Sequence, residues 1–245
     1  MVWLPRWGCD GMITSAQKLL MARAGAGGTV GGGVIEFIDY LAFDDSAGDT
    51  TVTFPAGVQN GDLVILLAAS DSNFEYSTPP SPFTEIWLCD LSNALTFGVH
   101  SQMSYGFYNA ATWPSSVVVT GASDSSGAVV AVYRNVSTIT SQTSNGQLQV
   151  TSAGPTVSFN SSTLSSSGRV LCAVAIDDDI PSAASQTGYT ADAVDFVGSK
   201  GANSGCGIVL TLSDSTISSG SYTPPDVSVT GVSGEVINSM YLLLT

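Results

Sequence analysis

The stretch TVTFPAGVQNGDLVILLAAS, residues 51–70, decides the fold, because it has the pattern of a strand, a turn and a second strand. The stretch TVSFNSSTLSSSGRVLCAVA, residues 156–175, repeats this pattern 105 residues later. Two further matches keep the same order: PFTEI at 82–86 with GYTAD at 188–192, and VVVTGASDSSGAVVAVY at 117–133 with VSVTGVSGEVINSMYLL at 227–243. Because the spacing drifts only from 105 to 110 residues, we interpret the chain as an internal repeat over about 51–136 and 156–245.

The repeat and the composition together predict an all-β protein, because Val, Thr, Ser and Gly favour strands and turns. Two repeats are too few for a solenoid, so we expect one jelly-roll-like antiparallel β-sandwich over residues 34–245, built from two similar sheets packed face to face. Two small tandem sandwiches are the alternative. The apolar run LVILLAA, residues 63–69, is typical of a strand covered on both faces or covered by a partner subunit.

Apolar runs between turn clusters predict a series of short strands over residues 34–245. The expected ranges are 34–43, 50–54, 62–70, 84–89, 97–108, 116–120, 127–133, 147–151, 155–159, 169–176, 188–196, 205–212, 226–230 and 235–244.

The charge of the chain is low in density and unevenly placed. Only 11% of its 245 residues are charged, and the formal net charge is −14. The first 23 residues carry three basic side chains and one acid, whereas the rest carries three basic and 19 acidic ones. A uniformly acidic body repels phosphate backbones, so we expect no binding to nucleic acid.

Residues 1–33 are predicted to form an N-terminal docking peptide, with a short helix at 13–24 followed by a Gly-rich linker at 25–33. Met12 is an alternative start to Met1. The apolar runs are too short for a transmembrane helix or a signal-peptide core, so no membrane insertion is expected. The docking candidates are Ile13, Lys18, Leu19, Leu20, Met21 and Arg23.

The sequence contains no pattern that predicts catalysis, and we expect no catalytic, cofactor-binding or metal-binding residues. His100 is the single histidine, and the four cysteines have no metal-ligand spacing; we expect Cys89 and Cys172 to be core thiols. Acidic residues gather after predicted strands, where solvated carboxylates are normal; bound calcium or a pair of acids for glycoside hydrolysis are the alternatives. These acids are Asp44, Asp45, Asp177, Asp178 and Asp179, with Asp192 and Asp195 nearby.

Trp113 is the candidate for a ligand-binding aromatic residue, because NAATWPSS is a predicted loop. Its ring either stacks on a sugar or a partner protein, or folds over the end of the sandwich.

The order PAGVQNGDLV (55–64), FT (83–84), GFY (106–108) and YRNV (133–136) resembles a β-sandwich domain of tailed-bacteriophage structural proteins. In that group the pattern pAGv..GDllv leads through P.GWt and vyyk strands to a closing a..aYrgv strand. This chain has Phe83 where the group usually has Trp and Asn135 where it usually has Gly, and it lacks the usual Lys after the aromatic strand.

The resemblance implies a non-enzymatic virion protein that docks through its N-terminus and displays the sandwich. It implies a tail-tip or short-fibre location first, with capsid decoration as the alternative and a carbohydrate-binding or glycan-hydrolysing module as a third possibility. Expected partners are other virion proteins, further copies of the chain as a homo-oligomer, in particular a trimer, and a host-surface glycan or protein.

Overall fold

The computed structural model describes residues 21–22, 33–45, 49–71, 79–92, 98–120, 126–148, 156–177, 183–201, 204–230 and 236–245. Every element in these residues is a β-strand and every strand pair is antiparallel, which confirms the predicted all-β fold. The strands are β1 (Met21–Ala22), β2 (Glu36–Asp45), β3 (Thr50–Thr53), β4 (Leu63–Asp71), β5 (Thr84–Ser92), β6 (Gly98–Phe107), β7 (Ser116–Val119), β8 (Ser126–Arg134), β9 (Thr138–Leu148), β10 (Thr156–Val157), β11 (Ser162–Leu164), β12 (Arg169–Asp177), β13 (Ala183–Gln186), β14 (Tyr189–Gly201), β15 (Ser204–Ser213), β16 (Gly220–Tyr222), β17 (Val227–Thr230) and β18 (Val236–Leu244).

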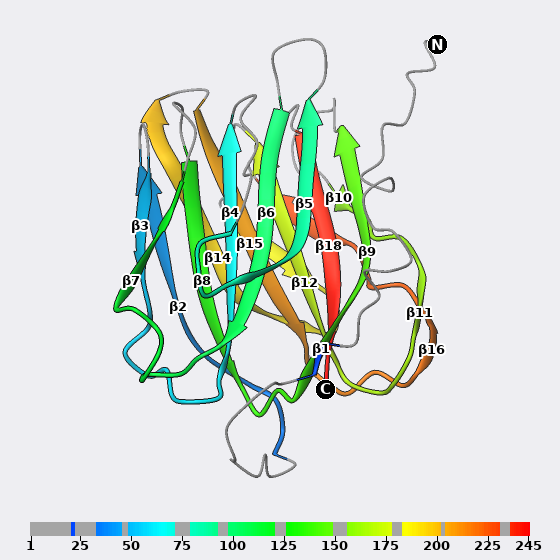
Figure 1. The fold of residues 1–245 in the computed structure, drawn as a ribbon. Coiled ribbons are helices and arrows are strands. Elements are labelled where there is room, and N and C mark those ends of the chain that lie inside the picture. Colours follow the sequence, from blue (N-terminus) through cyan, green and yellow to red (C-terminus); the bar gives the residue numbers. More distant parts are fainter. Residues whose placement is uncertain are drawn as a thin grey trace, which may run out of the picture.

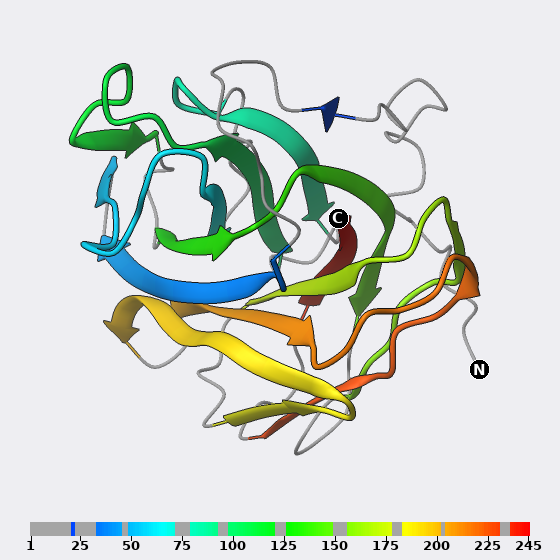
Figure 2. The same cartoon turned by 90° about the horizontal axis from the view of Figure 1, so that it is seen from below.

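Two large sheets form the centre of the molecule (Figure 1). The first half of the chain gives a sheet in the order β2-β8-β4-β6-β5, and the second half gives a sheet in the order β1-β9-β18-β12-β15-β14, with β1 added from the N-terminal part. Figure 2, which looks along the strands, shows the blue and green strands of the first half stacked on the yellow and orange strands of the second. Small sheets cover the outer faces: β3-β7 lies over the first large sheet, and β10-β17-β13 and β11-β16 lie over the second.

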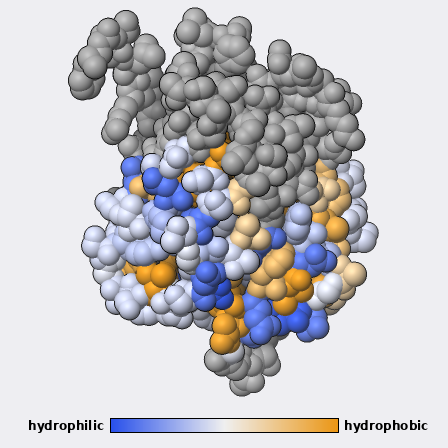
Figure 3. All heavy atoms as spheres, turned by 180° about the vertical axis from the view of Figure 1, so that it is seen from behind, coloured by the Kyte–Doolittle hydropathy of each residue, from blue (hydrophilic) through white to orange (hydrophobic). Residues whose placement is uncertain are grey.

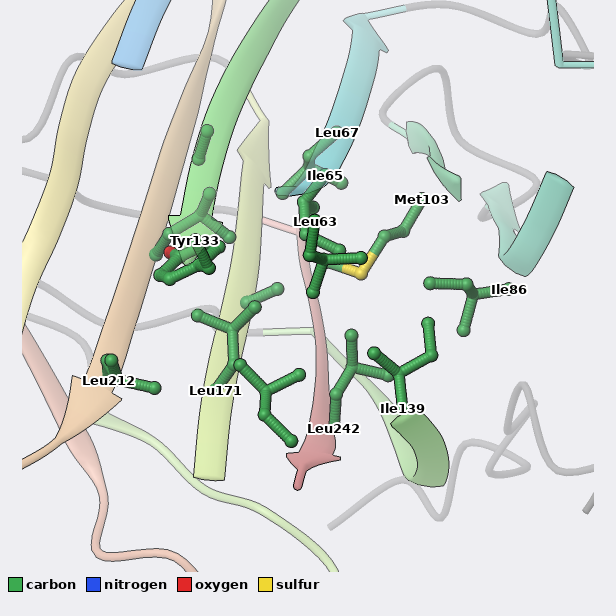
Figure 4. Close-up of a cluster of buried hydrophobic side chains, with 14 of the residues drawn as sticks. Leu63, Ile65, Leu67, Ile86, Met103, Tyr133, Ile139, Leu171, Leu212 and Leu242 are labelled. Atoms are coloured by element: carbon green, nitrogen blue, oxygen red, sulfur yellow. The ribbon is translucent and has the colours of Figure 1, made fainter. Parts of the chain in front are cut away.

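Three apolar cores fill the spaces between these four layers. In the middle core, Leu63, Ile65 and Leu67 of β4 point toward residues of the other large sheet, among them Leu171 (Figure 4). The alternate residues of β4, including Leu66, instead face the cover sheet β3-β7. The apolar run of β4 is therefore covered on both faces within the chain, and no partner subunit is needed to explain it.

The two halves of the chain have the same strand order and are related by an approximate twofold axis. The order β2-β8-β4-β6-β5 in one large sheet corresponds to β9-β18-β12-β15-β14 in the other. Across the middle core β2 packs on β14 and β5 packs on β9, while β4 packs on β15 and β6 packs on β12. Each contact thus has a counterpart with the two halves exchanged, which is the signature of an isologous interface.

This arrangement combines the two architectures that the sequence left open. The two large sheets pack face to face as predicted for one sandwich, and each half also carries its own cover, as predicted for two small sandwiches. The repeat that was found in the sequence corresponds strand by strand, because β3, β4, β7 and β8 match β10, β12, β17 and β18.

The sequence match between β4 and β12 is, however, out of register by one residue. Aligning Gly61 with Gly168 pairs Leu63 with Val170, but Leu63 faces the middle core and Val170 faces the outer core. The residues of β12 that face the middle core, as Leu63 does in β4, are Leu171, Ala173 and Ala175. A one-residue shift exchanges the two faces of a strand, and both faces of β12 are apolar, so the letters alone do not reveal the shift.

Several strands were missed or misplaced. The strand expected at 147–151 is β9, which begins at Thr138 and ends at Leu148. Its sequence TITSQTSNGQL is polar, because β9 lies near the edge of its sheet with only the two-residue β1 beside it. The short strands β11, β13 and β16 of the covers also went unrecognised. The helix expected at 13–24 lies outside the described residues except for Met21–Ala22, which form β1 and pair with β9.

We predict that Leu171→Ala lowers the free energy of unfolding by about 2–5 kcal/mol, because it opens a cavity in the middle core between the sheets. Val118→Thr on β7 is the control, since Val118 is 45% exposed and its replacement should change stability by no more than about 0.5 kcal/mol. Chemical denaturation measures both, and equal stability of the two variants would contradict the position of Leu171.

Candidate functional site

The residues of the phage-like pattern lie at one end of the sandwich, where they hold the backbone in place. Asp62 is buried and accepts two hydrogen bonds from the Arg134 guanidinium, 2.9 Å from Nε and 2.8 Å from Nη2. The Asp62 carboxylate also accepts a 2.8 Å bond from the Gln59 amide, and Arg134 Nη2 donates to the Gly57 carbonyl at 3.0 Å. The hydrogen bonds from Arg134 to Asp62 raise the pKa of the guanidinium. This ion pair connects the turn PAGVQNGD, residues 55–62, to Arg134 at the end of β8.

Asn135 has a backbone conformation that few residue types adopt. Its φ is 64°, in the left-handed region where Gly and Asn are favoured. Asn135 Nδ2 donates a 2.9 Å hydrogen bond to the Val34 carbonyl, which a glycine could not do. Arg169 Nη1, from the second half, donates a 3.0 Å bond to the Ile35 carbonyl. Both halves therefore hold the backbone at 34–35, directly before β2 of the first large sheet.

Trp113 is half-buried in an aromatic cluster at the same end. Its ring centroid lies 5.3 Å from that of Phe54, 5.2 Å from Phe83 and 5.3 Å from Tyr108. The ring also lies against Gly106, where an added Cβ would be 2.6 Å from Trp113 Cζ2. These contacts support the interpretation of a ring folded over the end of the sandwich; ligand binding by Trp113 remains a prediction.

A polar cluster lies at the junction between the two halves. Tyr133 of β8 and Asp192 of β14 are both buried, and Arg169 of β12 interacts electrostatically with both. Burial, and then the charge of Asp192, raise the pKa of Tyr133 far above its usual value. Burial raises the pKa of Asp192 from 3.8 to about 7, against the lowering effect of Arg169.

The burial of Asp192 corrects the sequence interpretation, which took this carboxyl to be a solvated loop group. Asp192 is only 8% exposed and lies in β14, where the pairing with β15 shifts between Ala191 and Ala193. The alternation in TADAVDF does not predict this burial, because the irregularity between Ala191 and Ala193 interrupts the alternation of faces at Asp192. The side chains of the other acids named from the sequence lie outside those that the structure describes.

A second polar network joins the large sheet of the second half to its covers. Thr211 donates to the side-chain carbonyl of Gln186, and Gln186 Nε2 donates to the Pro225 carbonyl at 2.7 Å. The hydroxyls of Tyr189 and Tyr222 share a 2.6 Å hydrogen bond. Cys172 lies beside this network as a buried free thiol, as expected from the sequence, and burial raises its pKa to about 12. A thiol of that kind is unreactive, so the network is structural.

The two ends of the sandwich differ in how the strands are connected (Figure 1). At the lower end, short described turns join the strands, for example at 54–62 and 135–137, and β2 begins there beside Arg134. At the upper end, pairs such as Asp71 with Val99 and Asp177 with Cys206 are the last before connections that lie outside the described residues. Strand β2 thus begins at the end of the sandwich opposite to those connections.

Most of the sequence-predicted docking residues lie outside the part of the chain that the structure describes. Of Ile13, Lys18, Leu19, Leu20, Met21 and Arg23, only Met21 falls in the described part of the chain, where it pairs with Ile139. His100 is buried within β6, opposite Ser70 of β4. Among the described residues, no three His, Cys, Asp or Glu side chains gather in a way that could hold a metal ion. The same residues contain no helix long and apolar enough to cross a membrane.

The described surface is polar without being highly charged. In Figure 3, a view from behind, much of the described face is pale, and apolar atoms occur in separate groups. The large apolar side chains that are exposed in the described part are Val34, at 71%, and Val118, at 45%.

We predict that Asp62→Asn lowers the free energy of unfolding by about 1–3 kcal/mol, because Arg134 and the Gln59 amide lose a charged acceptor at a buried position. Asp226→Asn is the matched control, because Asp226 is exposed in the turn before β17 and its replacement should change stability by no more than about 0.5 kcal/mol. Urea denaturation of both variants measures the difference. A loss in Asp226→Asn as large as that in Asp62→Asn would contradict the role of the ion pair.

Comparisons with protein-family models, with curated proteins and with solved structures find no match to this chain.

Proposed function

We propose that the chain is a non-enzymatic structural protein of a tailed-phage virion. In this proposal, residues 1–33, of which Met21–Ala22 pair with β9 as β1, dock onto the particle through the rest of this segment, and the jelly-roll-like sandwich is displayed. A tail-tip or short-fibre location ranks first, and capsid decoration is the alternative. The proposed assembly is a homo-oligomer, a trimer in particular, whose other partners are virion proteins and a glycan or protein on the host surface.

The single observation that supports this proposal best is the position at which the chain joins the sandwich. The backbone at 34–35 is held at the lower end by Asn135 from the first half and by Arg169 from the second. A docking peptide that precedes residue 33 would therefore leave the upper end directed away from the particle. Loops on a rigid scaffold are where binding residues concentrate, so this orientation suits display.

The use of the pattern residues also favours a structural role. The polar side-chain groups of these residues form hydrogen bonds within the chain. Asp62 binds Arg134 and the backbone N–H of Gln59, and Asn135 binds the Val34 carbonyl. Groups that are satisfied in this way are not free to bind a substrate. A compact protein held together by such contacts fits display better than catalysis.

We predict that reversing the basic charges of the docking peptide, with Lys18→Glu and Arg23→Glu together, removes the protein from particles of the phage that encodes it. Lys200→Glu is the matched control, because it reverses the same kind of charge in the sandwich and should leave incorporation unchanged. Mass spectrometry of purified virions measures the amount. Absence of the wild-type chain from virions would overturn the proposal, and equal incorporation of all variants would overturn docking through this peptide.

Antibody labelling of intact particles and of tailless heads separates the two locations. Label confined to tails agrees with the leading proposal, and label on tailless heads would replace it with capsid decoration. Hydrolysis of a host polysaccharide that is lost in Asp177→Asn or Asp179→Asn would overturn the non-enzymatic role.

A further inference from the structure

The polar cluster at the junction brings ionisable groups from three strands together inside an apolar boundary. Tyr133 comes from β8 in the first half, and Asp192 and Arg169 come from β14 and β12 in the second. Tyr133 belongs to the middle core, where its ring centroid lies 5.7 Å from that of Phe37 of β2. The cluster therefore lies where the two halves meet.

Three atoms of this cluster are buried and make no hydrogen bond of standard geometry: Tyr133 Oη, Asp192 Oδ2 and Arg169 Nε. Burying a polar group without such a bond is costly, and burying an unpaired charge costs much more. A neutral carboxyl group at Asp192 keeps the cost low, because its proton can be shared with the Tyr133 hydroxyl. Tyr133 and Arg169 favour the ionised form of Asp192, but the effect of burial, which favours the neutral form, is larger.

The charged and titratable groups that face Asp192 come from each element that packs on β14. Tyr133 faces it from β8, and β2, which also packs on β14, contributes Tyr40 to the edge of the middle core. Arg169 acts on it from β12, and Asp214, in the turn after β15, acts on it with a repulsive charge. The neighbouring strand β13, Ala183–Gln186, contains no titratable side chain.

We propose that Asp192 makes the junction between the two halves a proton-dependent joint, which is closed while this carboxyl is neutral and weakened when it ionises. Ionisation loosens the packing of β14 on β8 and β2. The negative charge also attracts the Arg169 guanidinium, whose Nη1 donates a hydrogen bond to the Ile35 carbonyl directly before β2. The protonation state of Asp192 is in this way linked to the backbone at Ile35, directly before β2. The proposal is independent of the proposed virion function.

The direction of the pH dependence follows from burial. Burial raises the pKa of Asp192 from 3.8 to about 7, so the folded protein keeps a proton that the unfolded chain has already lost over this range. A raised pKa of an acid means that the stability contributed by this group is greatest below about pH 4, falls between there and about pH 7, and is level above about pH 7. The Arg169 charge and the Tyr133 hydroxyl oppose this effect, and Asp214 strengthens it.

Thermal unfolding of the full chain between pH 5 and pH 8.5 tests the joint. We expect the Tm of the wild-type protein to fall by roughly 5 °C or more across this range, and the Tm of Asp192→Asn to stay nearly constant. Asp214→Asn should keep the fall but move its midpoint to lower pH, because a repulsive charge near Asp192 is removed. A role that is only structural would not move that midpoint.

His100→Gln is the control for the single histidine, because histidine is the residue type whose unperturbed pKa lies nearest to neutral pH, and this variant should keep the wild-type fall. A fall in Asp192→Asn parallel to that of the wild type would overturn the proposal. Should Asp192→Asn fail to fold, carbon-13 NMR of the aspartate carboxyl groups in the wild-type protein decides the question directly. A buried carboxyl with a midpoint near pH 7 supports the joint, and the absence of any aspartate midpoint above pH 5 overturns it.

Discussion

The packing of the two large sheets on each other is the interaction on which the rest of the structure depends. A sheet of this kind has two apolar faces, and a small cover of two or three short strands can bury only the outer one. The inner face is buried only when the other half is in place. Because burial of apolar area is the main favourable term in folding, the middle core makes one unit of two similar sandwiches.

The twofold relation explains why one chain contains the same pattern twice. An isologous interface buries the same surface of both partners, so fusing two copies of a symmetric dimer produces the observed arrangement. The copies have since diverged where the covers meet the large sheets. The first half uses an aromatic cluster around Trp113, while the second uses the hydroxyl and amide network around Gln186. A polar contact across the junction, from Asn238 Nδ2 to Ser101 Oγ at 2.9 Å, helps to set the alignment of the two halves.

The sequence predicted the fold class and most of the strands of the large sheets, because β4, β8, β12 and β18 are apolar runs between clear turns. It did not predict β9, whose position near a sheet edge allows polar residues. It also did not predict β11, β13 and β16 of the covers, which have three or four residues each and no apolar run. The alignment of β12 with β4 could not be inferred from the sequence repeat to within one residue, because both faces of β12 are apolar.

The polar contacts were harder to predict than the strands. Asp62, Arg134 and Asn135 stood out in the sequence as parts of a pattern, but the pairing of Asp62 with Arg134 joins residues that are 72 positions apart. The positive φ of Asn135 could not be predicted from its neighbours in the sequence. Asp192 lies in the expected strand 188–196 but was grouped with the solvated acids, because its burial depends on the other half of the chain, which local sequence does not reveal.

Native-state hydrogen exchange of the backbone amides of β4 and β12 tests the central claim that the middle core makes one cooperative unit. These strands lie inside their sheets, one in each half, and share that core. The account predicts that the slowest amides of both strands exchange with the same free energy of opening and the same dependence on denaturant. Exchange of one strand by a separate, lower-energy opening while the other stays protected would contradict it.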